Sequence, residues 1–269
     1  MNKSIKRKTI YLQGGFGNIL FQLVFFKYLE QLGYSSLVAT QLTKKNIATK
    51  ILGWKIHDEG YNKLLTRLNI QVKKTSIFEV ILNLIYGRFS QLRKKPVFKT
   101  YFIESDYQLK NLVKADTFFG YYQDKKFLNS NKRNIKLIGE KLKEVLPDVS
   151  KTYNTVIHYR YGDSIWAKKH SDYYEKVINH INHSETIGVV TDSPEEAKQF
   201  FKDFENIKIL NNTPLEDFSL MTKAEILYVA PSTFSYWAYL SLDENKTAVL
   251  PKMLVSRLGT PGRAKSIIL

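Results

Sequence analysis

Short apolar runs and amphipathic stretches alternate along the second half of the chain. Apolar runs of a few residues are typical of strands buried on both faces, and the stretches between them have helical periodicity. The pattern predicts strands over residues 155–160, 186–191, 207–210, 226–229 and 248–250, the last of which is expected to end the sheet. It predicts helices over residues 173–181, 194–204, 217–223 and 233–240. Such a series folds as a parallel sheet with helices on both faces.

The first half of the chain begins in a similar way but is less regular. Residues 9–13 predict a short buried strand, residues 14–18 form a glycine-rich loop, and the apolar positions of residues 19–33 predict a helix. Beyond it, helices are clear only over residues 77–91 and 134–145. Residues 146–153 have the composition of a linker, so we expect two domains, 1–150 and 151–269.

The basic residues are concentrated in the first of these domains. The 269 residues carry a formal net charge of +16; residues 1–150 hold 27 Lys and Arg against 11 Asp and Glu, and residues 151–269 hold 14 of each. The first domain is therefore expected to bind an anionic partner: nucleic acid, a phospholipid surface or a phosphorylated substrate.

The chain has no Cys, which excludes disulfides, thiolate metal sites and a Cys nucleophile. We find no signal peptide and no run of about 20 apolar residues, and we expect a cytoplasmic protein.

Polar loops follow four of the predicted strands, and ligands of open parallel sheets bind beyond the carboxyl ends of the strands. In the first loop, Gly14, Gly15 and Gly17 let the backbone approach a ligand closely, and the helix that follows offers its amides to an anion. The alternative is that these glycines only make a tight turn. If the strands are as predicted, the four loops converge on one crevice.

The second loop holds His158 and Arg160, which lie two apart and therefore on one face of the strand end. The planar guanidinium of Arg160 suits a diphosphate and keeps its charge at every working pH. The alternative is a buried ion pair between Arg160 and Asp163 that holds a turn.

The remaining loops add hydroxyls and carboxylates. Ser232, Thr233, Phe234 and Ser235 lead into a helix, where they either bind an anion or simply cap the helix. Asp217 either caps its own helix or accepts hydrogen bonds from the edge of a guanine. The five His show no metal-ligand spacing, and the chain has no P-loop motif.

Four sequence blocks together are similar to the bacterial α-1,2-fucosyltransferases of glycosyltransferase family 11. They are Gly14-Gly15-Phe16-Gly17-Asn18, Gly120-Tyr121-Tyr122-Gln123, His158-Tyr159-Arg160-Tyr161-Gly162-Asp163, and Asp217-Phe218-Ser219-Leu220-Met221 with Ser232-Thr233-Phe234-Ser235-Tyr236-Trp237. They occur in the family's order and span nearly the whole chain. The third block resembles a His-x-Arg-Arg-Gly-Asp motif, with Tyr161 in place of its second Arg. Losing that guanidinium removes a charge-assisted contact of about 1.5–3 kcal/mol.

The resemblance implies a GT-B-like α/β fold, with two Rossmann-like lobes and a cleft between them. It implies metal-independent, inverting transfer of L-fucose from GDP-fucose to the 2-hydroxyl of a galactoside, in the synthesis of a surface polysaccharide such as O-antigen or capsule. It implies no cofactor beyond the GDP-fucose substrate. Separately, the positive charge of the first domain suggests that the domain lies against an anionic membrane surface to reach an acceptor glycan linked to a polyprenyl diphosphate.

The resemblance also assigns roles to individual residues. Arg160 would bind the donor diphosphate, His158 and Asp217 the guanine, Ser232 and Thr233 the β-phosphate, and Asp192 would lie near the nucleoside. The predicted donor site is Gly14, Gly15, Gly17, Asn18, His158, Arg160, Asp192, Asp217, Ser232, Thr233, Phe234 and Ser235, and the predicted catalytic residues are Arg160 and Asp163. Asp163 is a candidate base for the acceptor hydroxyl, although orienting Arg160 is the role that we prefer for it.

The basic first domain leaves two further hypotheses open. The helix over residues 77–91, with Arg93-Lys94-Lys95 after it, could lie in an anionic inner membrane surface; the preferred alternative is a core helix followed by a solvated basic turn. Net charge and abundant Tyr would also permit a nucleic-acid-binding protein. No nucleic-acid-reading motif is present, so we expect no nucleic-acid partner. A glycosyltransferase that uses another nucleotide sugar is a third alternative.

Overall fold

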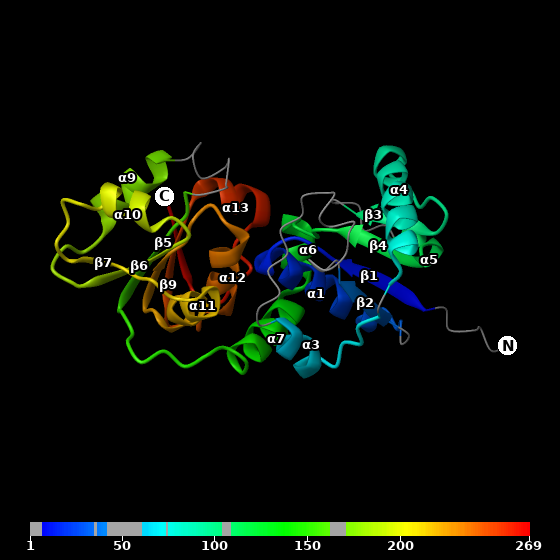
Figure 1. The fold of residues 1–269 in the computed structure, drawn as a ribbon, viewed down its shortest axis with the longest axis horizontal. Helices are drawn as coiled ribbons and strands as arrows, with labels where there is room; N and C mark the ends of the chain where they lie inside the picture. Colours follow the sequence, from blue (N-terminus) through cyan, green and yellow to red (C-terminus); the bar gives the residue numbers. More distant parts are fainter. Residues whose placement is uncertain (1–6, 35–36, 42–60, 74, 104–108, 162–170) are drawn as a thin grey trace. The chain divides into compact units, whose positions relative to one another are not determined.

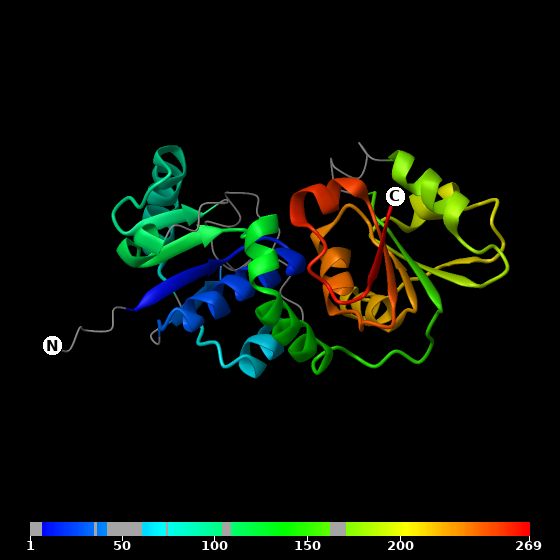
Figure 2. The same ribbon diagram turned by 180° about the vertical axis from the view of Figure 1, so that it is seen from behind.

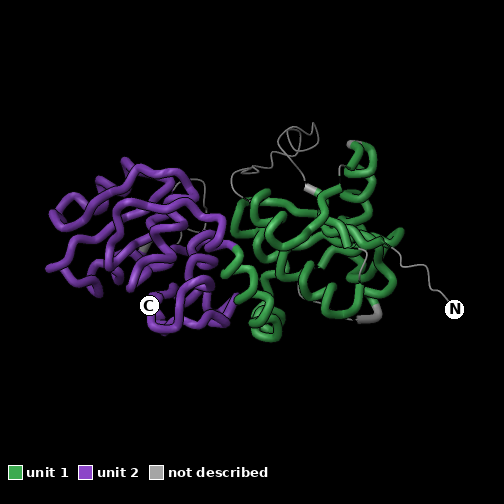
Figure 3. The backbone as a smooth tube through the Cα atoms, turned by 90° about the horizontal axis from the view of Figure 1, so that it is seen from below, with its two compact units in different colours: residues 1–141 green, residues 142–269 purple. Residues whose placement is uncertain are grey.

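The computed structural model of the chain describes residues 7–34, 37–41, 61–73, 75–103, 109–161 and 171–269. It consists of two compact units, residues 1–141 and 142–269 (Figure 3). Each unit contains its own parallel sheet and is described by itself. The predicted linker contains a stretch without regular structure at residues 147–153. The boundary between the two units, after residue 141, lies ahead of this stretch. Lys143, just after the boundary, forms an ion pair of 2.8 Å with Asp243.

Unit 1 is built on a four-stranded sheet with the order β2-β1-β4-β3. All three of its strand pairs are parallel. Its elements are β1 (Lys8–Leu12), α1 (Phe16–Gln31), β2 (Leu37–Gln41), α3 (Tyr61–Arg67), α4 (Ile77–Arg93), β3 (Thr100–Ile103), α5 (Leu109–Lys114), β4 (Thr117–Gly120), α6 (Lys125–Ser130) and α7 (Lys132–Lys143).

Helices cover both faces of this sheet because neighbouring residues of its strands point to opposite sides. Phe118 packs edge-on against Phe25 of α1, with 5.5 Å between ring centroids. Its neighbour Phe119 stacks on Tyr11 at 4.1 Å and packs with Val80 of α4. Helices α1 and α4 therefore lie on opposite faces of the sheet (Figure 2).

Unit 2 is built on a six-stranded sheet with the order β10-β9-β8-β5-β6-β7 (Figure 1). All of its strand pairs are parallel. Its elements are β5 (Thr155–Tyr159), α9 (Ser171–His180), β6 (Ile187–Thr191), α10 (Pro194–Phe200), β7 (Ile207–Ile209), α11 (Pro214–Lys223), β8 (Ile226–Tyr228), α12 (Thr233–Ser241), β9 (Thr247–Leu250), α13 (Lys252–Leu258) and β10 (Lys265–Ile268).

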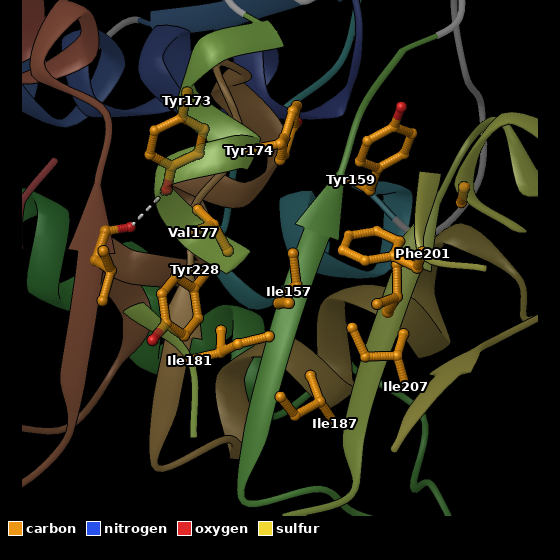
Figure 4. Packing of buried hydrophobic residues seen from close by; sticks show 13 residues of the cluster. Ile157, Tyr159, Tyr173, Tyr174, Val177, Ile181, Ile187, Phe201, Ile207 and Tyr228 are labelled. Atoms are coloured by element: carbon orange, nitrogen blue, oxygen red, sulfur yellow. Dashed lines mark hydrogen bonds between the residues drawn. The ribbon is translucent and has the colours of Figure 1, made fainter. Parts of the chain in front are cut away.

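One face of this sheet carries an aromatic-rich core. Ile157 and Tyr159 of β5 pack with side chains of α9 and with Phe201, which follows α10 (Figure 4). The hydroxyl of Tyr173 donates a hydrogen bond of 3.2 Å to the carbonyl of Val249, so this buried tyrosine also has a polar partner. His158 lies between Ile157 and Tyr159 and points to the other face, where α12 packs. The fold thus directs His158 away from the aromatic core.

The predicted α/β architecture of residues 155–250 is confirmed, and most element ends agree within a few residues. The expectation that residues 248–250 end the sheet is wrong, because α13 and β10 follow and β10 pairs with β9. Helix α1 begins at Phe16 rather than at residue 19, so Gly17 and Asn18 belong to its first turn. Helix α11 begins at Pro214 because Thr213 forms a capping box with Glu216.

Candidate functional site

The sheet of unit 2 reverses its strand order beside β5. The chain runs from β5 through β6 to β7 on one side, then crosses to β8 and continues outward through β9 to β10. The connections after β5 and β8 therefore leave in opposite directions at the carboxyl ends of these two neighbouring strands. Ligands of open α/β sheets bind at such a switch point, because the diverging loops leave a crevice there. We therefore examine the residues that follow β5, β6 and β8.

His158 is the penultimate residue of β5, and only 4% of its surface is exposed. Its ring lies 5.8 Å from that of Phe234 in an edge-on arrangement. Burial, together with the charge of Arg160, lowers the pKa of His158 to about 3, so the imidazole is neutral at physiological pH. Within the described residues its Nδ1 atom has no hydrogen-bond partner. A buried polar atom without a partner is costly, and such an atom at a strand end is suited to meeting a ligand.

Arg160 follows β5 directly, and its guanidinium lies at the edge of the sheet rather than in the core. Its Nη1 atom is 3.2 Å from Oδ2 of Asp192, with 27% of the Arg160 side chain and 31% of the Asp192 side chain exposed. The backbone N–H of Arg160 donates to the hydroxyl oxygen of Tyr174 at 2.9 Å. A guanidinium keeps its positive charge at every working pH, and its planar set of N–H donors matches the oxygens of a phosphate. The geometry thus presents a positive charge at the switch point.

Asp192 also holds the start of the loop that follows β5. Its Oδ1 atom accepts a hydrogen bond of 3.4 Å from the backbone N–H of Tyr161 and one of 3.3 Å from the hydroxyl of Ser193. The ring of Tyr161 stacks on that of Tyr159, with 6.2 Å between centroids. Tyr161 therefore packs on the core rather than supplying a second cation. Asp163, the other predicted catalytic residue, lies outside the described residues.

The first turn of α12 follows β8 at the same edge of the sheet. Ser232 caps the helix, and its hydroxyl accepts a hydrogen bond of 3.2 Å from the N–H of Phe234. Ser232 and Thr233 are partly exposed, whereas Ser235 is fully buried and bonds to the carbonyl of Ala230. The first turn contains no acidic residue, so its partial positive charge is not offset from within the helix.

Asp217 lies in the first turn of α11, beside this helix. Asn212 donates a hydrogen bond of 3.1 Å to its carboxylate. Burial is the main cause that raises the pKa of Asp217 to about 7, with the charge of Glu216 acting in the same direction and the bond from Asn212 opposing it. Phe218 packs edge-on against Phe234 at 5.2 Å, and this contact joins α11 to α12. Asp217 therefore changes charge close to neutral pH.

The glycine loop occupies the corresponding switch point in unit 1, where β1 is flanked by β2 and β4. Gly14 has a φ of +85°, and a Cβ atom there would lie 2.7 Å from the side chain of Asn18, so another residue would be strained. Gly15 caps α1 without a side-chain hydrogen bond. Gln123, which follows β4, donates 2.8 Å to the carboxamide oxygen of Asn18 and ties the two loops together. Buried Gly17 serves the packing of α1.

Two residues of this geometry were not anticipated from the sequence. The hydroxyl of Tyr174 accepts a hydrogen bond from the backbone N–H of Arg160 and donates one of 3.4 Å to the carbonyl of His158. Tyr174 therefore fixes the backbone at the end of β5. Asn212 donates a hydrogen bond to Asp217 and so opposes the rise of its pKa. For Tyr174, the only sequence signal is its place in the Tyr173-Tyr174 pair, which indicates burial and not a contact with β5. For Asn212, the signal is an amide side chain just ahead of the capping residue Thr213.

Unit 2 also contains a cavity of about 240 Å³ at the opposite edge of its sheet. Its lining includes Asp148 from the segment before β5, Lys223 from the end of α11 and Lys246 from the residue before β9. Lys223 pairs with Asp148 at 3.3 Å. The cavity lies at the amino ends of the strands, away from the switch point, so we do not place the functional site there.

Two further searches cover the described part of the chain. No group of three or more His, Cys, Asp or Glu side chains is arranged there to hold a metal ion. None of its helices is long and apolar enough to cross a membrane.

Comparison with known proteins assigns the fold. No protein-family model and no curated protein sequence matches the chain. Among solved structures, the E. coli heptosyltransferase WaaC with ADP is similar to it over 97% of this chain and 93% of that chain, with a TM-score of 0.50 and 12% sequence identity. The chain therefore has the fold of that glycosyltransferase, a GT-B fold with two α/β units.

Two other solved structures, one of them the fucosyltransferase NodZ, are more distant in shape. NodZ from Bradyrhizobium gives a TM-score of 0.38 at 13% identity, over 88% of this chain and 94% of that chain. POFUT1 in complex with GDP-fucose gives 0.41 at 12% identity, over 98% and 99%.

Proposed function

We propose that the protein is a glycosyltransferase that binds the diphosphate of a nucleotide sugar at the carboxyl edge of the unit 2 sheet. The observation that carries this proposal is the position of the Arg160 guanidinium beside the switch point between β5 and β8. Ser232 and Thr233, at the positive end of α12, flank the same point. The GT-B fold shared with a heptosyltransferase supports the proposal.

The proposed reaction is transfer with inversion and without a metal. The acceptor hydroxyl attacks the anomeric carbon from the face opposite the diphosphate, a new C–O bond forms, and the bond to the β-phosphate oxygen breaks with its electron pair. The leaving diphosphate gains negative charge, which Arg160 and the amides and hydroxyls at the start of α12 would stabilise. The acceptor proton passes to a base, for which Asp163 remains our candidate because of its place in the motif.

The donor that we propose is GDP-fucose. A carboxylate accepts from the two adjacent N–H groups of a guanine edge, and the partly buried Asp217 would do so once it is ionised. Neutral His158, whose Nδ1 has no partner among the described residues, would contact the same nucleoside. The acceptor that we propose, from the motif resemblance, is the 2-hydroxyl of a galactoside in a surface polysaccharide.

A thermal-shift panel with GDP, UDP, ADP and GMP tests this proposal. We expect GDP to stabilise the protein most, by about 2.7 kcal/mol at 100 times its dissociation constant. Arg160→Ala should weaken GDP binding about tenfold or more, because it removes a charge-assisted contact to the diphosphate. Arg257→Ala, an exposed arginine near the end of α13, is the matched control and should bind GDP as the parent does.

Two results would contradict the proposal: no nucleotide shifts the parent, or both arginine variants lose GDP equally. A larger shift with ADP or UDP would contradict the choice of donor and leave the diphosphate site standing. GDP release from GDP-fucose in the presence of a galactoside then tests the transfer itself.

A further inference from the structure

Helix α4 of unit 1 has two apolar faces, and the sheet covers only one of them. On the covered face, Val80 is fully buried and packs with Tyr11 and Phe119. Ser90 is buried on the same side, where its hydroxyl accepts a hydrogen bond of 3.1 Å from the N–H of Phe102 in β3. On this side α4 is buried against the sheet, as expected for the core helix that the sequence favours. The other side of α4 is exposed.

Five large apolar side chains form an exposed row on the opposite face of α4, which we call the apolar stripe. They recur every three or four residues and therefore line up along the helix. The stripe consists of Phe78 (72% exposed), Ile81 (43%), Ile85 (46%), Phe89 (51%) and Leu92 (71%). Single exposed apolar residues are ordinary on a protein surface, but an aligned row of this size marks an interaction surface.

The segment that carries the stripe is also strongly basic. Between Val80 and Ile103 the sequence contains five Lys or Arg and no Asp or Glu. They are Arg88, Arg93, Lys94, Lys95 and Lys99, all of them exposed. Glu79, at the start of α4, is held in an ion pair of 2.9 Å with Lys73. The surface that surrounds the stripe is therefore positively charged.

We propose that the apolar stripe docks on an anionic lipid bilayer, with α4 lying in the plane of the lipid headgroups. A helix with one apolar face and basic residues beside it is suited to this position, because the apolar groups enter the acyl boundary while the cations meet lipid phosphates. A second copy of the chain fits poorly, because pairing two stripes would bring two sets of five positive charges together. Nucleic acid would match the charge but would leave the apolar row exposed to water.

Vesicle co-sedimentation of the full chain tests the stripe. The parent should bind vesicles that contain phosphatidylglycerol and should bind pure phosphatidylcholine vesicles much more weakly. Phe89→Ser with Leu92→Ser should weaken binding about tenfold or more, because two large side chains no longer enter the bilayer. Leu32→Ser with Leu137→Ser is the matched control, since both leucines are 39% exposed and lie away from α4, Leu32 just after α1 and Leu137 in α7. This variant should bind as the parent does.

A second pair of variants tests the charge. Lys94→Glu with Lys95→Glu should weaken binding to the anionic vesicles, and added salt should weaken binding of the parent. Lys132→Glu with Arg133→Glu makes the same change in net charge at exposed positions of α7 and should have a much smaller effect.

The inference is overturned if the parent does not sediment with anionic vesicles, or if it binds both kinds of vesicle equally. It is also overturned if the parent self-associates without binding vesicles and the stripe variant disrupts this self-association, because the stripe would then be an interface between copies. Circular dichroism checks that each variant is folded. The inference does not depend on the proposed function, because the GDP shift of the stripe variant reports on that function separately.

Discussion

Two buried titratable residues of unit 2, His158 and Asp217, have pKa values that move in opposite directions for the same reason. Burial disfavours the charged form of each, so the pKa of His158 falls to about 3 and that of Asp217 rises to about 7. Near neutral pH the imidazole is therefore uncharged, and the carboxylate is close to its titration midpoint. A ligand that needs the charged carboxylate must then bind more weakly as the pH falls.

The first prediction concerns Asp217. If its carboxylate accepts hydrogen bonds from guanine, GDP affinity should be highest above pH 7 and fall about tenfold between pH 8 and pH 6, because acid neutralises the acceptor. Asp217→Asn should bind GDP more weakly at pH 8 and lose this additional pH dependence. Isothermal titration from pH 8 to pH 6 measures both. The phosphates of GDP titrate equally in parent and variant, so a parallel pH profile for the two proteins would contradict the assignment.

At the scale of elements, helix starts supply most of the polar groups that we assign to the site. Helix α12 begins at Ser232, whose hydroxyl satisfies the N–H of Phe234, and α11 begins with the capping box of Thr213. Both helices start at or near the carboxyl edge of the sheet because a parallel strand must be followed by a crossover that returns along its face. The same cap thus serves the stability of the helix and the position of its amides.

The second prediction separates these two roles. Ser232→Ala should lower the free energy of unfolding by about 1 kcal/mol, the usual cost of losing a helix cap. It should also weaken GDP binding, because the hydroxyl and the ordered amides would meet the β-phosphate. Ser76→Ala is the matched control, because Ser76 caps α4 and its hydroxyl accepts a hydrogen bond from the N–H of Glu79 that is also 3.2 Å long. This variant should lose a similar free energy of unfolding and keep the GDP affinity of the parent. Chemical denaturation and calorimetric titration give the two quantities. Equal GDP affinities for the two variants would limit Ser232 to capping.

At the scale of the whole molecule, the two units differ in charge and in the sites that we propose for them. All of the net positive charge lies in the first 150 residues, together with the apolar stripe, whereas residues 151–269 are balanced at 14 residues of each sign. Unit 2 contains a complete six-stranded sheet with its own core and the predicted diphosphate site. Donor binding should therefore depend mainly on unit 2.

The third prediction is that a fragment of residues 142–269 folds and binds GDP. It should unfold in one cooperative thermal transition followed by circular dichroism, and GDP should raise the midpoint of that transition. Arg160→Ala in the fragment should make this increase much smaller at the same GDP concentration, as in the full chain. A fragment that folds but ignores GDP, while the full chain responds, would place essential donor contacts in unit 1.

The sequence alone was enough to predict the α/β class and most elements of residues 155–250, because each is a local pattern: an apolar run, a helical period, a capping residue. The edge strand β10 was not foreseen, since Lys265-Ser266-Ile267-Ile268 lacks such a run and is a strand only through its pairing with β9. Tertiary structure alone decided that β8 lies beside β5, which brings Ser232 and Arg160 to one edge of the sheet. It also paired Arg160 with Asp192, 32 residues away in sequence, and left one apolar face of α4 uncovered. Periodicity shows that a helix has apolar faces, but which face is buried depends on which strands pack against it.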